Sequence, residues 1–257
     1  MAQQNELREK KGKLHPSIRL HGELAQLIQN SNPGEKLPSE PTLAHMLGVS
    51  RATLREGMRT FETQGLIMRR QGVGTFVMPQ TRIIETGLEV LESLERQANR
   101  IGLAVSMGEL EISEIIADSE IAEKLQVEEE TRLTKISRVI SADQRPVAFL
   151  VDTLSPGLIT EEELQSGFTG SVLDFLLVRG APGLLKSFTD IQAVAAEPVI
   201  ARKLQIQRGD VLLLFTARLY SDAGEIIDYS MSYFLPGYFR FHVVRNVATN
   251  LATSKAL

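Results

Sequence analysis

Hydrophobic positions near the start of the chain follow a helical period. A first helix is predicted from about residue 17 to 29, because its apolar residues recur on one helix face: Ile18, Leu20, Leu24, Leu27 and Ile28. Two further helices should follow, each with a serine at its N-cap, namely Ser39 and Ser50. Strands are then expected at 66–70 and 75–77, joined by a glycine-rich tip. Three helices followed by a hairpin are the order of a winged helix-turn-helix.

The rest of the chain contains an internal repeat. The segment IAEKLQV at 121–127 matches IARKLQI at 200–206, so residues 115–149 and 194–228 correspond at an offset of 79. Each match is followed by a strand, an Asp-containing turn and another strand. Two such units predict one continuous antiparallel sheet with helices packed on it. Chance similarity is the alternative, but the matched order of turns argues against it.

These patterns predict an α+β protein with two folded domains. Further helices are expected at 88–101 and 171–178. The expected division runs in order: a disordered tail at 1–13, a DNA-binding domain at 14–78, a linker at 79–85, a sheet domain at 86–246 and a C-terminal tail at 247–257.

Charge is divided between the two domains. Residues 1–80 carry 11 Lys and Arg against 7 Asp and Glu, whereas residues 81–257 carry 17 against 25. A basic N-terminal domain fits contact with DNA phosphates, and an acidic second domain does not. We therefore expect double-stranded DNA as a partner of the first domain.

Several other classes of protein are disfavoured. The chain has no cysteine, its N-terminus has no apolar signal segment, and no apolar run is long enough to span a bilayer. The four histidines are scattered and no catalytic motif occurs. We expect a cytoplasmic protein without a membrane partner, cofactor, metal site or catalytic residues.

The third helix carries the residues expected to read DNA. Arg51, Arg55 and Arg59 form a basic stripe at intervals of four. A recognition helix enters the major groove by its N-terminal end, so Arg51 and Arg55 are predicted to contact bases or nearby phosphates. Ala52 and Thr53 are placed to touch a thymine methyl group.

Other residues are predicted to contact the DNA backbone. They are Ser50 and Arg59 on the helix, with Arg69, Arg70 and Gly72 in the hairpin. The alternative is a small helical domain with solvated arginines. The order of caps, turn, basic stripe and basic hairpin favours DNA binding.

The segment 37–77 resembles the GntR family of bacterial transcription regulators in its run LPSE, LGVSRATLRE and QGVGTFV. The resemblance implies a homodimer on a short palindromic operator, with DNA contacts at Ser39, Ser50, Arg51, Thr53, Arg55 and Gly72. The family usually has Arg directly after Pro-Ser-Glu, where this chain has Pro41. That difference implies a missing contact and a different operator sequence.

The second domain resembles the effector-binding UTRA domain of the HutC branch of that family. The resemblance rests on the repeat, the segment around Arg138, residues 170–173 and residues 227–230. It implies a domain that has the fold of chorismate lyase but binds a small molecule without converting it. The predicted effector-binding residues are Glu95, Arg138, Asp152, Ser171, Asp228, Ser230 and Tyr233.

The second Arg of a phosphate-gripping pair in relatives is Ile140 here. Loss of one Arg favours an uncharged sugar or a zwitterion over a phosphorylated ligand. Three of the predicted residues also have a purely structural interpretation: Arg138 as an inter-strand ion-pair partner, Asp228 as an exposed turn or strand residue, and Ser171 as a helix cap only.

The sequence thus predicts a metabolic repressor that a small-molecule effector releases from its operator. One alternative is an architectural or partner-regulated DNA-binding protein without an effector. An enzyme fused to a DNA-binding domain is a further, weaker alternative.

Overall fold

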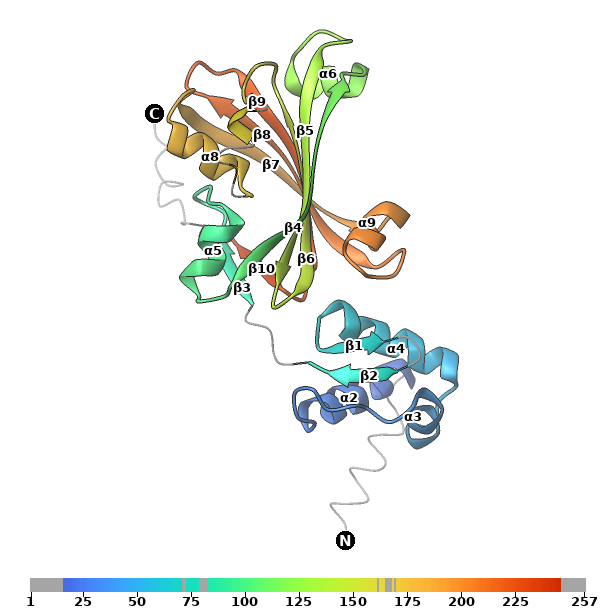
Figure 1. Ribbon diagram of the computed structural model, residues 1–257. Helices are drawn as coiled ribbons and strands as arrows, with labels where there is room; N and C mark the ends of the chain where they lie inside the picture. Colours follow the sequence, from blue (N-terminus) through green and yellow to red (C-terminus); the bar gives the residue numbers. More distant parts are fainter. Residues whose placement is uncertain are drawn as a thin grey trace, which may run out of the picture.

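The computed structural model describes residues 16–70, 73–78, 83–160, 162–164, 168 and 170–245. They form an N-terminal head of helices with a small hairpin and a larger body built on a six-stranded sheet (Figure 1). The predicted α+β architecture is confirmed. No helix in the described part of the chain is long and apolar enough to cross a membrane.

The head has the predicted order of three helices and a hairpin. Its elements are α2 (Pro16–Gln29), α3 (Glu40–Met46), α4 (Arg51–Thr63), β1 (Ile67–Arg70) and β2 (Gly74–Val77). Its core is formed by apolar side chains of every element, including Leu20, Leu24, Leu43, Leu54, Met58, Phe61, Ile67 and Val77. Burial of these side chains fixes α4 against α2 and α3.

The body contains one antiparallel sheet in the order β4-β5-β6-β9-β8-β7. Its strands are β4 (Val105–Ile116), β5 (Arg132–Ala142), β6 (Arg145–Leu154), β7 (Leu184–Ala195), β8 (Val211–Ser221) and β9 (Ile226–Phe234). The two halves of the sheet are the two repeat units, which meet where β6 pairs with β9.

Each repeat unit is one strand longer than predicted. The hairpins β5-β6 and β8-β9 and the short helices α6 (Ser119–Leu125) and α9 (Pro198–Lys203) lie where the repeat placed them. The sequence did not reveal β4 and β7, which precede the helices. Both are edge strands and largely exposed, so no buried face imposes an alternating apolar pattern on them.

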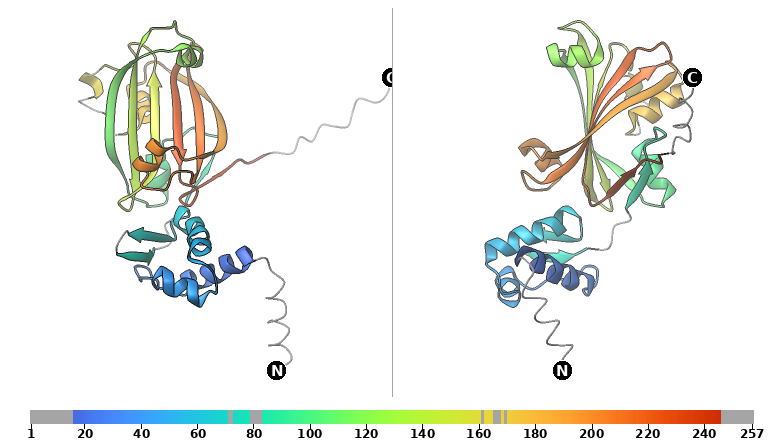
Figure 2. Two further views of the ribbon diagram at one scale, coloured as in Figure 1. Left: turned by 90° about the vertical axis from the view of Figure 1, so that its right-hand side faces the viewer. Right: turned by 180° about the vertical axis from the view of Figure 1, so that it is seen from behind.

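Helices cover the two faces of the sheet in pairs. Helices α5 (Leu94–Arg100) and α8 (Val172–Arg179) lie on one face, and α6 and α9 lie on the other (Figures 1 and 2). The prediction of a helix over 88–101 was wrong for its first six residues. The helix begins only at Leu94, because Ser93 caps it and accepts the Arg96 N–H at 3.2 Å.

A short parallel strand pair lies at the entry to the body. Strand β3 (Ile84–Gly87) pairs with β10 (Phe239–His242), which follows the last strand of the sheet. The segment that leaves the head is thereby tied to the last described strand of the body.

Candidate DNA-reading face and effector site

Helix caps position the DNA-reading segment of the head. The Ser39 hydroxyl accepts the Thr42 N–H at 3.4 Å at the start of α3, and the Ser50 hydroxyl accepts the Thr53 N–H at 3.1 Å at the start of α4. A cap that satisfies a free N–H fixes where a helix begins. The Ser50 cap therefore determines which residues form the exposed N-terminal turn of α4.

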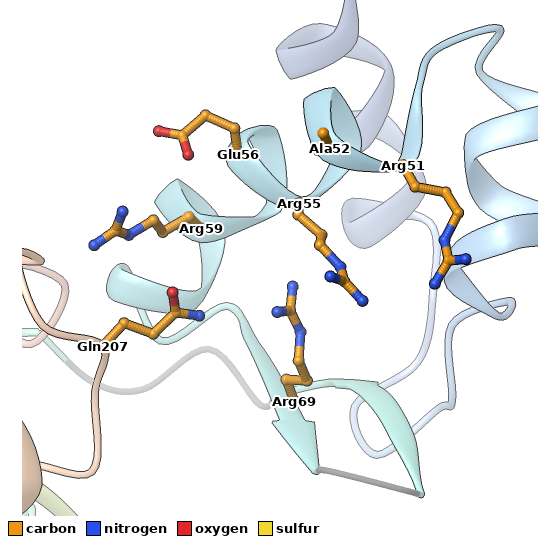
Figure 3. A pocket seen from close by; sticks show the side chains of 7 residues that line it. All are labelled: Arg51, Ala52, Arg55, Glu56, Arg59, Arg69 and Gln207. Atoms are coloured by element: carbon orange, nitrogen blue, oxygen red, sulfur yellow. The ribbon is translucent and has the colours of Figure 1, made fainter.

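A basic hollow lies along α4 and the first strand of the hairpin. Its volume is about 690 Å³, and it is lined by Arg51, Ala52, Arg55, Glu56, Arg59, Arg69 and Gln207 (Figure 3). Four predicted DNA-binding arginines are thus brought to one surface. Only Gln207 comes from the body.

Glu40 holds two of these arginines beside each other. Its carboxylate lies 2.7 Å from Arg55 Nε and 3.5 Å from Arg69 Nε. Glu40 is the first residue of α3, so this ion-pair network fixes the hairpin against α4. Arg51 is exposed and has no ion-pair partner among the described residues.

Arg59 contacts the body. Its Nε lies 2.5 Å from Asp210 Oδ1, and its Nη2 donates to the Arg208 carbonyl at 3.0 Å. Asp210 raises the pKa of Arg59 further above its ordinary value, chiefly through this hydrogen bond. In this arrangement Arg59 is held by protein groups on the body side of the basic hollow.

Gly72 and the side chain of Arg70 lie outside the described residues. The backbone of Arg70 pairs with Gly74 in the hairpin.

A buried charged cluster lies on the sheet face beneath α5 and α8. Arg138, Asp152 and Asp228 are only 4%, 7% and 6% exposed. Strand register places Ser230 opposite Asp152 and Asp228 opposite Leu154. The side chains on this face of the sheet therefore include Arg138, Asp152, Asp228 and Ser230. The structure therefore brings together residues from β5, β6 and β9, as predicted from the resemblance.

Arg138 and Asp152 form an ion pair within this cluster. The inter-strand pairing considered for Arg138 is therefore present. The Arg138 guanidinium also lies 5.9 Å from the centre of the Phe168 ring. Its Nε and Asp228 Oδ1 are buried without a hydrogen-bond partner among the described residues. An unpaired buried polar atom costs free energy, so each of the two atoms would be stabilised by a hydrogen bond.

Asp228 is buried in a strand, and the exposed position considered for it is wrong. Burial raises the pKa of Asp228 well above its ordinary range, and neighbouring Asp152 raises it further, while Arg138 partly offsets the effect. Burial and the neighbouring acid thus favour the protonated form of the Asp228 carboxyl group.

The N-termini of α5 and α8 meet above the cluster. Ser171 caps α8 by accepting the Asp174 N–H at 3.0 Å, and Ser93 donates to Asp174 Oδ2 at 2.6 Å. Glu95 in the first turn of α5 is mostly buried, with Oε1 lacking a hydrogen-bond partner in the described chain. Burial raises the pKa of Glu95, and Arg138 is among the charges that act on it.

Tyr233 lies apart from this cluster. It pairs with Phe149 and stacks on it with ring centroids 6.3 Å apart, on the opposite face of the sheet. Burial, followed by the charge of Glu197 beside α9, raises the pKa of Tyr233. The structure thus brings together six of the seven predicted effector residues and leaves Tyr233 on the α9 side.

Comparison with known proteins matches a family model to each of the two parts of the chain. The family model "Bacterial regulatory proteins, gntR family" matches residues 18–77, and the family model of the UTRA domain matches residues 101–240. The chain belongs to the GntR family. This GntR regulator is therefore a ligand-responsive DNA-binding protein with an effector domain of the HutC-like type.

Named relatives share most of its length. It is 30% identical over 201 residues to the histidine utilization repressor of Pseudomonas putida, covering 77% of this chain and 79% of that one. It is 26% identical over 209 residues to the transcriptional repressor NagR of Bacillus subtilis, covering 81% and 85%. The solved structure of PhnF from Mycobacterium smegmatis has the same fold, with a TM-score of 0.59 at 21% identity, covering 89% of this chain and 100% of that one.

Two contributors to the sites of this GntR regulator were not predicted. Asp174 completes a Ser-x-x-Asp sequence with Ser171, which is a known signal at a helix start and was available in the sequence. Asp210 carried no such signal, because its contact with Arg59 joins residues 151 positions apart.

Proposed function

We propose that this GntR regulator is a repressor that binds a palindromic operator as a homodimer and releases it when a small polar metabolite occupies the cluster around Arg138. The observation that carries the proposal is the buried, incompletely hydrogen-bonded set of charges beneath α5 and α8, in a protein whose head presents a basic DNA-reading face. A bacterial operator lies in the cytoplasm, so the protein acts there.

On DNA, the N-terminal turn of α4 enters the major groove. Arg51 and Arg55 contact base edges, where a guanidinium pairs well with guanine, and Ala52 and Thr53 lie against thymine methyl groups. Arg69 and the hairpin contact phosphates on either side. A homodimer would place two heads one helical turn apart on the palindrome.

The cluster favours a ligand without a phosphate group. Arg138 is the cation of the cluster among the residues that the structure describes, and its charge is already opposed by Asp152. Asp228 and Glu95 add two further acidic groups. A zwitterion or a polyhydroxyl compound satisfies this set: a carboxylate or hydroxyl accepts from Arg138 Nε, while ammonium or hydroxyl groups donate to the acids. Relatives named for histidine utilization are consistent with an amino-acid-like effector.

Thermal shift of the full-length protein tests this assignment. The panel contains free amino acids and their breakdown products, unphosphorylated sugars, and the matching sugar phosphates. A ligand that binds only the folded state raises the unfolding midpoint by mass action. We expect an unphosphorylated zwitterion or sugar to raise the midpoint of the wild type and to have little effect on Asp228→Asn.

Asp190→Asn is the matched control, because Asp190 is an exposed aspartate on the edge strand β7. It should respond to the ligand as the wild type does. A sugar phosphate that stabilises the wild type far more than its free sugar would overturn the proposed ligand class. A ligand whose effect survives Asp228→Asn unchanged would place the effector elsewhere.

A further inference from the structure

A short loop of the body, residues 207–210 between α9 and β8, contacts the DNA-reading helix α4. Gln207 forms part of the lining of the basic hollow, next to Arg59 (Figure 3). Asp210 pairs with Arg59 Nε at 2.5 Å, and the Arg208 carbonyl accepts from the same guanidinium at 3.0 Å. Arg59 belongs to the basic stripe that α4 directs toward DNA phosphates.

The two oxygens of the Asp210 carboxylate accept hydrogen bonds from different domains. Oδ2 accepts the Gln207 N–H at 3.0 Å within its own turn, whereas Oδ1 reaches Arg59 in the head. Asp210 is only 6% exposed. A buried carboxylate is stable only when it is paired, so the ion pair with Arg59 holds the two domains together.

The internal repeat shows what the same turn looks like without this contact. At the offset of 79, Thr131 corresponds to Asp210, and Ala117 corresponds to Ala196. The Ala117 N–H donates to the Thr131 carbonyl at 2.9 Å, as the Ala196 N–H donates to the Asp210 carbonyl at 2.7 Å. The Thr131 hydroxyl, however, donates to the Glu128 carbonyl of its own turn at 2.6 Å. A turn of this type therefore does not need an aspartate.

Close packing beside the ion pair keeps the head against the body. A Cβ atom on Gly237 would lie 2.4 Å from the Gln64 backbone, and one on Gly65 would lie 2.7 Å from the Tyr238 hydroxyl. Arg145 also donates to the Tyr238 hydroxyl at 3.3 Å. The C-terminal end of α4 is therefore seated directly on the body in this arrangement.

We infer that Asp210 competes with DNA phosphate for Arg59 and so holds the head in an arrangement with reduced affinity for DNA. One positive charge of the DNA-reading face is neutralised by Asp210, and a carboxylate stands where a phosphate would approach. Opening the ion pair returns the guanidinium to the backbone contact expected of it. The inference rests on this inter-domain contact alone and does not depend on which effector binds the cluster around Arg138.

Binding of a random-sequence DNA duplex, followed by fluorescence anisotropy over a range of KCl concentrations, tests the inference. Asp210→Asn keeps an oxygen for the turn but removes the charge, and Asp210→Thr copies the first repeat unit. Both variants should bind the duplex several-fold more tightly than the wild type. The plot of log Kd against log salt should steepen by about 0.9, the value for one additional phosphate contact.

Two further variants separate this competition from a general change in charge. Asp222→Asn removes an exposed aspartate from the β8-β9 turn and should leave DNA affinity unchanged. In the Arg59→Ala background, Asp210→Asn should give no gain in DNA affinity, because the arginine for which Asp210 and phosphate compete is absent. Unchanged or weaker binding by both Asp210 variants, or an equal gain in the Arg59→Ala background, would overturn the inference.

Discussion

At the residue scale, the surroundings of a charged side chain determine its role. Arg51 is exposed on the DNA-reading face, Arg59 is held by Asp210, and Arg138 is buried against Asp152. The spacing of arginines in the sequence predicted the exposed stripe, because helical periodicity is local. It did not predict the partner of Arg59, which depends on how two separately folded domains meet.

Asp228→Asn should change how the stability of the protein depends on pH. The raised pKa of Asp228 means that the folded state holds a proton that the unfolded chain releases above its ordinary pKa of about 4. Wild-type stability therefore falls as pH rises from that value through the raised pKa. The amide lacks this cost, so the stability of Asp228→Asn relative to the wild type should increase as pH rises above about 4. Urea unfolding at each pH measures the free energy of unfolding of both proteins. A stability difference between them that does not vary with pH would contradict the raised pKa of Asp228.

Arg51→Ala and Arg55→Ala should each reduce sequence-specific binding. The operator is first obtained by selecting bound duplexes from a random pool. Loss of a base contact costs about 1–3 kcal/mol at the selected site and relaxes the preference for it. Anisotropy with the selected duplex and a scrambled duplex gives both affinities. An equal loss on the two duplexes would show that the arginine contacts only the DNA backbone.

At the element scale, the strand-helix-hairpin unit is used twice to build one sheet. The sequence predicted the helices and hairpins, because their apolar residues alternate or recur with a clear period. It missed β4 and β7 and began α5 six residues early. Edge strands have few buried positions, and the N-terminal boundary of α5 depends on the single cap Ser93. The cluster beneath α5 and α8 was anticipated only through the family resemblance.

Ser171→Ala should destabilise the body by removing the N-cap of α8. Removal of a serine cap costs about 0.5–2 kcal/mol, and Asn is an equally good cap, so Ser171→Asn should restore most of the loss. The midpoint of urea unfolding measures both variants. Ser187→Ala, on the edge strand β7, is the control and should be close to the wild type. Equal midpoints for Ser171→Ala and Ser171→Asn would show that the hydroxyl does not act as a cap.

At the scale of the whole molecule, the two domains differ in charge and are in direct contact. The basic head binds DNA, the acidic body holds the buried cluster, and the two touch through the 207–210 loop and Gly237. A ligand changes DNA affinity only if it binds the two head arrangements with different strength.

Gly237→Ala should separate the head from the body. The added methyl group would lie 2.4 Å from the Gln64 backbone, which cannot move without moving the end of α4. Small-angle X-ray scattering should therefore show a larger radius of gyration for Gly237→Ala than for the wild type. Gly22→Ala is the control, since a Cβ atom there meets nothing within 4 Å. An unchanged radius for Gly237→Ala would mean that the head is not seated on the body in solution.

The most direct test of the account is release of the selected operator duplex by ligand. Anisotropy of the labelled duplex bound to full-length protein is followed while the amino acids, sugars and sugar phosphates of the panel are titrated. The account predicts that an unphosphorylated zwitterion or sugar releases the duplex from the wild type and that Asp228→Asn needs at least about a tenfold higher concentration, equivalent to 1.4 kcal/mol. Release by the same concentration of ligand in both proteins, or binding of the ligand without any change in DNA affinity, would contradict it.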